Sequence, residues 1–381
     1  MSQDSKQITF QHVVLEGSAY EVGRLQGEII KNVPEARNFY CSGKGKFASQ
    51  EFSRILQLFE QFCPGLQEEL NGFADSLGGS LEDVVYYAQT YLKATPPRCS
   101  HLAVLPSLTA EKHVLIGRSY EFSDTMDDLR LCTTRVHGKY AHIGFSSIVF
   151  GRLDGMNERG LSVTMSAAGG PVGTLPGMRP PAQDGFHFWA LLRTILDQCQ
   201  TVEEAIALTQ EFPLCCNLNL IVAHKSGNAA LIEIASPHQS IKKIDASTAD
   251  QFVCSTNHLT QPEMIQHIPT MMKNSGGRYQ TIISRLKEAR PRITTETIRG
   301  ILSDPYPKGL CFHYYQEFLG TLWSLIFDLN AGTAEICFGS PIVNQWHTFD
   351  VPGAAESAQY LVTLPQEMAE PGFWQQVPVE A

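Results

Sequence analysis

The sequence predicts an α+β layered sandwich, and the order of helix-like and strand-like stretches is the first observation behind this. Residues 17–95 read mostly as helix, because apolar residues such as Tyr20, Val22 and Leu25 recur at helical spacing. From residue 99 onward the chain is rich in valine, isoleucine, threonine and phenylalanine, which favour strands. Helix-like stretches then alternate with two more groups of strands. Such grouping is typical of helices packed on stacked sheets.

Short polar turns within the strand-rich stretches are the second observation. Residues 154–165 (DGMNERGLSVTM) are typical of a hairpin, and residues 225–228 (KSGN) form a tight turn between two apolar stretches. A last hairpin is expected around residues 330–333 (NAGT). Strands joined by tight turns pair antiparallel, whereas parallel strands need a long crossover. The sequence therefore predicts antiparallel sheets.

Two helices are predicted in the middle of the chain, over residues 186–199 and 201–212. Thr201 begins the second helix with a predicted capping box, and Trp189 is expected to face the core from the first. Residues 169–185 precede these helices and are rich in proline and glycine, so a long loop is predicted there. Long loops in compact domains are often lids over functional sites.

Composition and charge exclude several classes of function. The 381 residues carry a net charge of −10, whereas nucleic acids and anionic membranes bind proteins through clustered lysine and arginine. No apolar stretch approaches the ~20 residues that cross a bilayer. The first residues (MSQDSKQITFQHVV) lack the pattern of a secretion signal, so a cytoplasmic protein is expected. Neither nucleic acid nor a membrane is an expected partner.

The ten cysteines are scattered and contain no CxxC pair. A disulfide framework is typical of short, cysteine-dense secreted chains, so reduced thiols are expected here. The zinc-ligand spacings CxxC and HExxH are also absent from the sequence. The sequence therefore predicts no metal and no organic cofactor. Cys215, Cys216 and Cys254 are expected to be buried packing residues.

Cys99 lies where the helical region gives way to the first strand, in TPPRCSHLAVLP (95–106). Two interpretations are open for it: a small buried hydrophobic residue, or a nucleophile. A thiol attacks as the thiolate and needs a base or a nearby positive charge. If the peptide bond before Cys99 were cut, the freed α-amine, with a pKa of about 7.7–8, would supply that base. In the uncut chain the same nitrogen is an amide and cannot.

Eight stretches, in order along the chain, carry a resemblance to a known family. They are RCS (98–100), GRSYEF (117–122), GMNERGL (155–161), NLNLIVAHKSGNAALIE (217–233), STNH (255–258), NSGGRYQTI (274–282), LSDPYPKGLCFH (302–313) and SLIFDLNAGTAEICFGSP (324–341). In these stretches the chain resembles the N-terminal-nucleophile (Ntn) hydrolases of the penicillin acyltransferase type, with choloylglycine hydrolases as more distant relatives. The resemblance implies a four-layer αββα Ntn-hydrolase sandwich. It also implies a helical N-terminal segment over residues 1–98, as a prosegment or small subunit, and a catalytic core over residues 99–381.

The resemblance assigns roles to individual residues. Cys99 matches the nucleophile, which is freed by self-cleavage of the Arg98–Cys99 bond. Arg118 matches the arginine beside the nucleophile, where a fixed positive charge favours the thiolate. Asn257 matches the asparagine whose side-chain N–H donates to the tetrahedral oxyanion. These assignments imply a site assembled from distant parts of the chain.

Glu121 and Arg278 complete the site that the resemblance implies. Glu121 stands where the family usually has an aspartate that holds the cysteine's amino group, and it is longer by one methylene. Arg278 matches a second arginine near the catalytic centre. Two other positions also depart from the family. Ala167 stands where choloylglycine hydrolases carry another oxyanion asparagine, so a backbone N–H is expected to substitute, and Arg98 stands where the penicillin acyltransferase has glycine.

Other residues are candidates for substrate binding, and simpler structural roles stay open beside the catalytic ones. Tyr120 and Phe122 alternate on one strand, so one of them is expected to line the acyl pocket. His258 is expected to line the pocket or to be structural, because an Ntn site needs no histidine. Arg118 is alternatively a surface ion-pair residue, and Asn257 is alternatively a turn residue.

The expected function is cleavage of a linear amide by an autoprocessed cysteine Ntn amidohydrolase or acyltransferase, through an acyl-enzyme on Cys99. Water as the acceptor gives a hydrolase, and an amine gives an acyltransferase. Two alternatives are an acyl-CoA-dependent N-acyltransferase and a non-catalytic binding or scaffold protein of the same fold. The expected partners are a small-molecule amide substrate and, after cleavage, the chain's own two fragments as a heterodimer. A homo-oligomer is also open.

Overall fold

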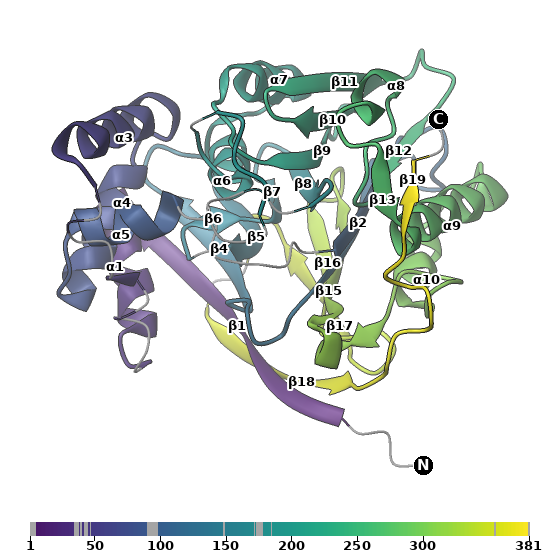
Figure 1. The fold of residues 1–381 in the computed structure, drawn as a ribbon. Coiled ribbons are helices and arrows are strands. Elements are labelled where there is room, and N and C mark those ends of the chain that lie inside the picture. Colours follow the sequence, from purple (N-terminus) through teal and green to yellow (C-terminus); the bar gives the residue numbers. More distant parts are fainter. Residues whose placement is uncertain are drawn as a thin grey trace.

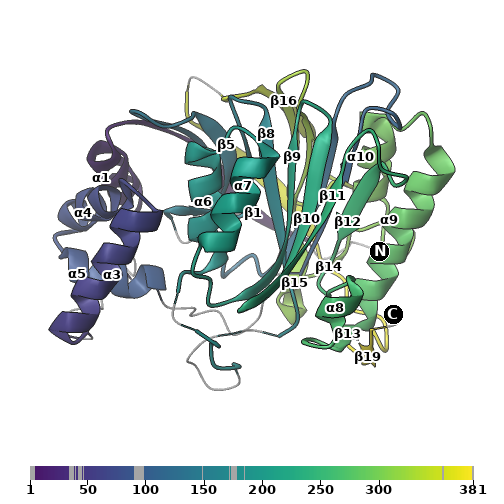
Figure 2. The same cartoon turned by 90° about the horizontal axis from the view of Figure 1, so that it is seen from above.

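A computed structural model describes residues 5–33, 38, 40, 41, 45, 47–89, 98–147, 149–170, 172, 178–183, 185–353 and 356–379. Two β-sheets lie face to face at the centre of the molecule (Figure 1). Figure 2 shows the layers in succession, with helices, sheet, sheet and helices. This is the α+β layered sandwich that the order of elements predicted, in the four-layer αββα form that the resemblance implied.

Strand pairing in the larger sheet follows the predicted hairpins. In spatial order its strands are β11 (His238–Ile244), β10 (Asn228–Ala235), β9 (Asn217–His224), β8 (Leu161–Ala167), β7 (Asp154–Asn157), β5 (His142–Ser147), β4 (Arg130–Val136), β1 (Ser5–Gly17) and β18 (Ala358–Pro365), with β6 (Gly151–Arg152) paired to β5. β7 and β8 form the hairpin predicted over residues 154–165. β9 and β10 form the hairpin predicted around KSGN. Both hairpins are antiparallel, as predicted.

Strand β1 departs from two expectations. It pairs antiparallel with β18 but parallel with β4, in a register that places Gln11 opposite Arg130. No tight turn constrains this direction, because the N-terminal helices and two strands of the other sheet separate β1 from β4 along the chain. The described strand pairs are otherwise antiparallel, as predicted, and the pairing of β1 with β4 is the parallel exception. Residues 1–98 are also not wholly helical, since they contribute a strand to the larger sheet.

The smaller sheet contains Cys99. In spatial order its strands are β12 (Phe252–Ser255), β2 (Arg98–Val104), β3 (Leu115–Phe122), β15 (Leu319–Asp328), β16 (Thr333–Phe338) and β17 (Trp346–Asp350), with β14 (His313–Tyr314) paired to β15. A separate ribbon pairs β13 (Thr270–Met272) with β19 (Gln376–Pro378). β15 and β16 form the predicted hairpin around NAGT. Cys99 is therefore the second residue of an inner strand, flanked by β3 and β12.

Helices surround the two sheets in three groups. The N-terminal group contains α1 (Ala19–Ile30), α3 (Ser49–Phe62), α4 (Leu66–Leu77) and α5 (Leu81–Gln89). The outer face of the larger sheet is covered by α6 (Phe188–Gln198) and α7 (Val202–Glu211), and that of the smaller sheet by α9 (Lys273–Ala289) and α10 (Thr295–Ser303) (Figure 2). The short helices α8 (Pro262–Ile265) and η1 (Tyr315–Glu317) lie in connections. Of the helices in the described ranges, none combines the length and apolar character needed to cross a bilayer.

The two central helices begin as their sequences predict, with one difference. The Thr201 hydroxyl accepts the N–H of Glu204 at 3.1 Å and caps α7. The Glu204 carboxylate accepts the N–H of Gln200 at 2.7 Å rather than that of Thr201, so the predicted capping box is only half formed. Trp189 is buried on α6, as expected. Helix α6 is buried on nearly all sides, because it lies between the larger sheet and the N-terminal helices.

A buried ion network joins the N-terminal helices to the rest of the molecule. Arg193 on α6 contacts Glu69 on α4 at 2.9 Å and Asp197, one turn along α6, at 3.0 Å. Gln26 on α1 donates to the Glu69 carboxylate at 2.6 Å, and His142 on β5 lies 3.0 Å from Asp197. None of these five residues is more than 4% exposed. Buried charges persist only when they are paired, so this network fixes α4 against α6.

We predict that Glu69→Ala lowers the free energy of unfolding by about 3–5 kcal/mol, because it leaves the buried Arg193 guanidinium short of a partner. Urea unfolding followed by circular dichroism measures the change. The matched control is Glu68→Ala, at the exposed neighbouring position on α4, which should change the free energy by less than about 0.5 kcal/mol. Equal losses in the two variants would contradict a structural role for the network.

Candidate active site

Four separate elements build the candidate site. β2 carries Cys99 itself, β3 carries Arg118, α9 carries Arg278, and the loop after β12 carries Asn257. All four residues are buried, each at most 3% exposed. Cys99 lies directly opposite Tyr120 on the neighbouring strand β3. The fold therefore brings together residues that the sequence analysis had assigned from distant stretches.

The Arg118 guanidinium contacts the Cys99 thiol. Its Nη2 lies 3.6 Å from Cys99 Sγ, and its Nη1 donates to the carbonyl of Met165 on β8. Its Nε lies 2.7 Å from Oδ2 of Asp154 on β7. Arg118 is therefore a buried ion-pair residue and not a surface one. Because Met165 and Asp154 belong to the larger sheet, that sheet sets the position of the guanidinium beside the sulfur.

Asp154 is a site residue that the sequence analysis missed. It is fully buried, and its carboxylate accepts the backbone N–H of Phe145 at 3.0 Å and the indole N–H of Trp323 at 3.1 Å. The sequence did carry a signal for Asp154: it is an acidic residue directly before GMNERGL (155–161), where a hairpin requires no acid. Its contacts make Asp154 the group that orients Arg118.

Side chains hold the backbone of Cys99 on both sides. The Cys99 N–H donates to Asn257 Oδ1 at 3.2 Å, and Arg278 Nη1 donates to the Cys99 carbonyl at 2.9 Å. Arg278 also donates to Ser100 Oγ at 2.6 Å and to Asn257 Oδ1 at 2.8 Å. One guanidinium therefore positions both the cysteine and the asparagine that holds its nitrogen.

The amide nitrogen of Asn257 donates to the carbonyl of Ala167, at the end of β8, at 2.9 Å. The resemblance expects this nitrogen to donate to an oxyanion. Nearby backbone N–H groups are also bonded, since Ala168 donates to the carbonyl of Asn217 at 3.2 Å and Gly169 to that of Asn257 at 3.3 Å. An oxyanion at this place would have to replace the Ala167 carbonyl as the acceptor.

Glu121 lies beside Arg278 rather than on the Cys99 nitrogen. Its Oε1 accepts the Ser119 hydroxyl, and its Oε2 lies 3.9 Å from Arg278 Nη1. Burial raises the pKa of Glu121 to about 7, although the Arg278 charge and the Ser119 hydrogen bond lower it. The nitrogen that the resemblance assigns to Glu121 donates to Asn257. Glu121 is therefore a buried carboxyl that exchanges its proton near neutral pH.

Burial also controls the protonation of the nucleophile candidate. Removal from water raises the pKa of the Cys99 thiol to about 12, although Arg118 lowers it. Glu121 adds to the rise, and Arg278 opposes it. The uncut chain therefore holds Cys99 as a neutral thiol at physiological pH, which is not the attacking form.

Besides Ala167, three residues were predicted to contact the substrate, and all three lie in packed surroundings. His258 is buried, its Nδ1 lies 2.9 Å from Ser275 Oγ, and burial lowers the pKa of its imidazole to about 4. Tyr120 stacks on Trp323 with ring centroids 3.9 Å apart. Phe122 is fully buried in the core between the sheets. Each side chain has a structural role here, and contact with a substrate stays a prediction.

Arg98 is the first residue of β2 and pairs in register with Glu121. Its side chain lies outside the described part of the structure, as do residues 171, 173–177 and 184 of the predicted loop. The roles expected for the cleavage bond and the loop therefore stay predictions. Cys99 is a free thiol. In the described ranges, no group of three or more histidine, cysteine, aspartate or glutamate residues could hold a metal ion.

We predict that Glu121 makes the protein lose stability as the pH rises from about 5 to 8. Between its ordinary pKa of 4.5 and its folded pKa of about 7, Glu121 holds a proton in the folded state that the unfolded chain has released. Its contribution is therefore complete below about pH 4.5 and lost as the pH rises through 7. The loss is roughly 3 kcal/mol, at 1.36 kcal/mol per pKa unit.

Urea unfolding at pH 5 and pH 8 checks this with Glu121→Gln, which cannot titrate. The variant should lose roughly 3 kcal/mol less than the wild type between the two pH values. The control, Glu158→Gln at an exposed position, should follow the wild type. Chains of the same covalent state are compared, as checked by intact mass. Parallel pH profiles for Glu121→Gln and the wild type would show that Glu121 does not titrate in this range.

Several solved structures are similar to this chain at low sequence identity. Penicillin V acylase from Agrobacterium tumefaciens is 18% identical, with a TM-score of 0.44 over 66% of this chain and 86% of the acylase. A mutant conjugated bile acid hydrolase from Clostridium perfringens is 12% identical, with a TM-score of 0.45 over 72% and 99%. A Caenorhabditis elegans ortholog of N-acylethanolamine-hydrolyzing acid amidase is 16% identical, with a TM-score of 0.43 over 61% and 93%. No curated protein matches the chain.

A family model gives the assignment. The model described as acyl-coenzyme A:6-aminopenicillanic acid acyl-transferase matches residues 108–343, which is more than half of the chain. The matched range includes Arg118, Asn257 and Arg278, and it begins shortly after Cys99. The chain belongs to the acyl-coenzyme A:6-aminopenicillanic acid acyl-transferase family.

Proposed function

We propose that the protein is a cysteine Ntn amidohydrolase or acyltransferase that cleaves linear amides through an acyl-enzyme on Cys99. The observation that carries this is the convergence of Arg118, Asn257 and Arg278 on one cysteine. A cysteine buried for packing behaves as a small hydrophobe and needs no such partners. Burying two guanidinium groups beside it is costly, and costs of this kind concentrate at functional sites.

The proposal includes self-cleavage of the Arg98–Cys99 peptide bond. In the uncut chain the Cys99 nitrogen is an amide whose N–H donates to Asn257. Addition of water across this bond would leave a carboxylate on Arg98 and an α-amine on Cys99. That amine, with a pKa of about 7.7–8, would be a base next to the thiol. Asn257 Oδ1, which accepts the Cys99 N–H in the uncut chain, would accept a hydrogen bond from the freed amine.

In the proposed reaction the Cys99 amine takes the thiol proton, and Sγ attacks the carbonyl carbon of the amide. N–H donors stabilise the tetrahedral oxyanion, and the Asn257 amide is the proposed one. The protonated amine then gives its proton to the leaving nitrogen as the C–N bond breaks, which leaves a thioester on Cys99. Water or an acceptor amine attacks the thioester, and the thiol is restored.

The neighbouring charged groups have separate proposed roles. Arg118, at 3.6 Å from the sulfur, favours the thiolate over the thiol. Asp154 is a positioning residue, because it acts on the sulfur only through Arg118. Arg278 fixes the backbone around Cys99, and Glu121 lies beside that guanidinium. No metal or organic cofactor takes part in the proposed reaction.

We propose that residues 1–98 remain bound after cleavage as a small subunit, and do not leave as a prosegment. β1 pairs with β4 on one side and β18 on the other. The contact between Glu69 and Arg193 crosses from the N-terminal helices to the core and is buried. Departure of the segment would break both sets of contacts. The two fragments would then form a heterodimer.

The description of the family favours one second candidate, an acyl-CoA-dependent N-acyltransferase. Here Cys99 Sγ would attack the thioester carbonyl, the CoA thiolate would leave with the thiol proton, and an amine would accept the acyl group. Both candidates share the acyl-enzyme and differ in the acyl donor. The N-terminal nucleophile and its partners have the same role in both.

Intact-mass analysis of the denatured protein tests the cleavage. We expect two chains of 98 and 283 residues, the second beginning with Cys99. Cys99→Ala should remain one chain, because the nucleophile is absent. The matched control is Cys254→Ala, a buried cysteine on the neighbouring strand β12, which should cleave like the wild type. A wild-type chain that stays uncut at neutral pH would contradict self-cleavage and favour the non-catalytic scaffold.

Acyl-donor competition tests which candidate holds. N-acylglycines of several chain lengths and the matching acyl-CoA thioesters are each incubated with the processed protein, and products are quantified by mass spectrometry. We expect the amides to be cleaved with the higher kcat/KM, and Cys99→Ala to lower kcat by at least about 10³-fold. Consumption of acyl-CoA alone, and only with an added amine, would favour the second candidate.

A further inference from the structure

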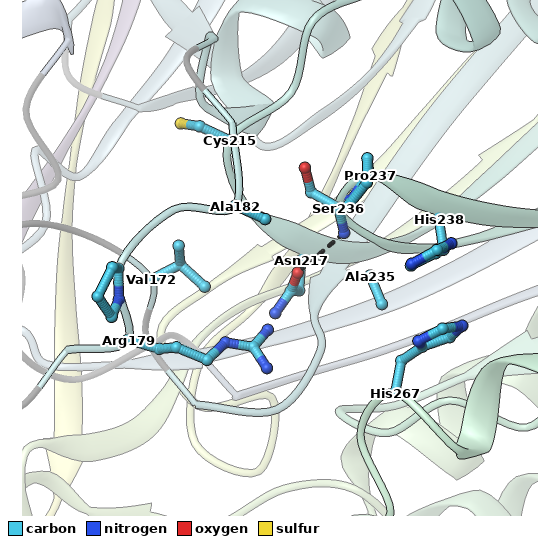
Figure 3. Close-up of a pocket in the computed structure, with 11 residues that line it drawn as sticks. Val172, Arg179, Ala182, Cys215, Asn217, Ala235, Ser236, Pro237, His238 and His267 are labelled. Carbon is cyan, nitrogen blue, oxygen red and sulfur yellow. Dashed lines mark hydrogen bonds between the residues drawn. The ribbon is translucent and has the colours of Figure 1, made fainter.

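A pocket with mixed polar and apolar walls lies at the same end of the sheets as Cys99. It has a volume of about 300 Å³ and is lined by the described part of the 169–185 loop and by the ends of β9, β10 and β11 (Figure 3). Its polar lining comes mainly from Arg179, Asn217, His238 and His267. The mechanism proposed above uses none of these four residues.

The pocket is linked to the site through two short backbone segments. Asn257, which holds the Cys99 nitrogen, donates from its side chain to the carbonyl of Ala167. The next N–H along, that of Ala168, donates to the carbonyl of Asn217 in the pocket wall at 3.2 Å. The end of β8 therefore contacts Asn257 through Ala167 and the pocket wall through Ala168. Three hydrogen bonds therefore connect the backbone nitrogen of Cys99, through Asn257 and the end of β8, to Asn217 in the pocket wall.

The pocket presents hydrogen-bond donors and positive charge. Figure 3 shows the Arg179 guanidinium and the Asn217 amide nitrogen directed at the same space. Asn217 is oriented by its other side-chain atom, since Oδ1 accepts the N–H of Ser236 at 3.1 Å. The imidazoles of His238 and His267 stack with centroids 4.0 Å apart and form the opposite wall.

Among the described residues that line this pocket, none is acidic. In the described part of the chain, Arg179 makes no ion pair with a carboxylate, although the protein as a whole carries a net charge of −10. Val172 and Arg179 pair as an isolated bridge, which positions the loop over the pocket. The planar guanidinium has the geometry for a bidentate contact with an anionic oxygen group.

We propose that this pocket binds an anionic oxygen group of the substrate, a carboxylate or a phosphate, while the scissile bond lies at Cys99. The inference rests on the proposed function, because it assumes that Cys99 is the nucleophile. Arg179 supplies the charge, and Asn217 supplies a fixed N–H donor. The carboxylate would be that of a substrate in which the scissile amide joins an acyl group to an amino acid. The phosphate would be that of a CoA thioester. Both present the same oxygen geometry to the guanidinium.

Affinity labels of graded length test the site on the processed protein. The probes are the iodoacetamides of glycine, 4-aminobutyrate and 6-aminohexanoate, each compared with its neutral carboxamide. Rates of labelling at Cys99 are read by peptide mapping. We expect the carboxylate form to label about tenfold faster at one of the lengths, which is the effect of one charge-assisted hydrogen bond.

Variants separate this site from the arginines beside Cys99. Arg179→Ala should remove the preference for the carboxylate, and Arg179→Lys should keep part of it, because lysine retains the charge without the fork. The matched control is Arg292→Ala, at an exposed position beyond the opposite ends of the strands, which should keep the full preference. A carboxylate preference that is unchanged in Arg179→Ala would overturn the site while leaving Cys99 as the nucleophile. Failure of every probe to label Cys99 ahead of the other cysteines would overturn the proposed function as well.

Thioester donors identify the source of the anion. Octanoyl-CoA is compared with S-octanoyl-pantetheine, which lacks the nucleotide and its phosphates. A preference for octanoyl-CoA that Arg179→Ala removes would assign the pocket to phosphate. Equal use of both thioesters, together with an Arg179-dependent carboxylate preference among the labels, would assign it to carboxylate. Independence from Arg179 in both comparisons would overturn the proposal.

Discussion

A buried ion pair between Arg118 and Asp154 joins the two sheets at the site, and the surroundings of the candidate nucleophile depend on it. Both side chains are fully buried, so neither charge could stay there without the other. Asp154 is anchored in turn by the Trp323 indole, and Trp323 stacks between Phe145 and Tyr120 with centroid distances of 4.0 and 3.9 Å. Since Trp323 and Tyr120 belong to the smaller sheet and Phe145 to the larger, the rings and the ion pair together fix how the sheets face each other. The position of the guanidinium beside the sulfur is therefore a result of sheet packing.

Two opposing effects act on the candidate nucleophile, and burial is the stronger in the uncut chain. Arg118 and Arg278 both favour a thiolate at Cys99, yet desolvation raises the pKa of the thiol to about 12. The same balance holds for Glu121. Burial raises the pKa of its carboxyl to about 7, although the charge of Arg278 lowers it. Charge alone does not activate a group that water cannot reach. A local change that admits water or frees a base at Cys99 shifts this balance toward the thiolate.

Local features of this protein could be predicted from the sequence, and features that depend on distant pairing could not. The hairpins β7–β8 and β15–β16 each occupy a short stretch, and their turn residues and alternation are sufficient to indicate them. Strand β1 has no such signal, because its partners β4 and β18 lie far along the chain and nothing near residues 5–17 records a parallel neighbour. The stretches around Cys99 and Arg118 indicated a site, yet the role of Asp154 appears only when the two sheets are packed together. The bond from Asn257 to Ala167 is of the same kind, since it joins the end of a strand in one sheet to a loop after a strand in the other.

The distances along the chain between the residues of the site bear on the order in which the protein is made. Asn257 and Arg278 follow Cys99 by 158 and 179 residues, so the ribosome releases the cysteine long before its partners. Until β12 and α9 have been synthesised, the backbone of Cys99 lacks both the acceptor for its nitrogen and the donor for its carbonyl. Strand β18, which completes the pairing of β1, is made later still. A nascent or prematurely terminated chain therefore contains the cysteine without its surroundings, and only the finished polypeptide assembles them.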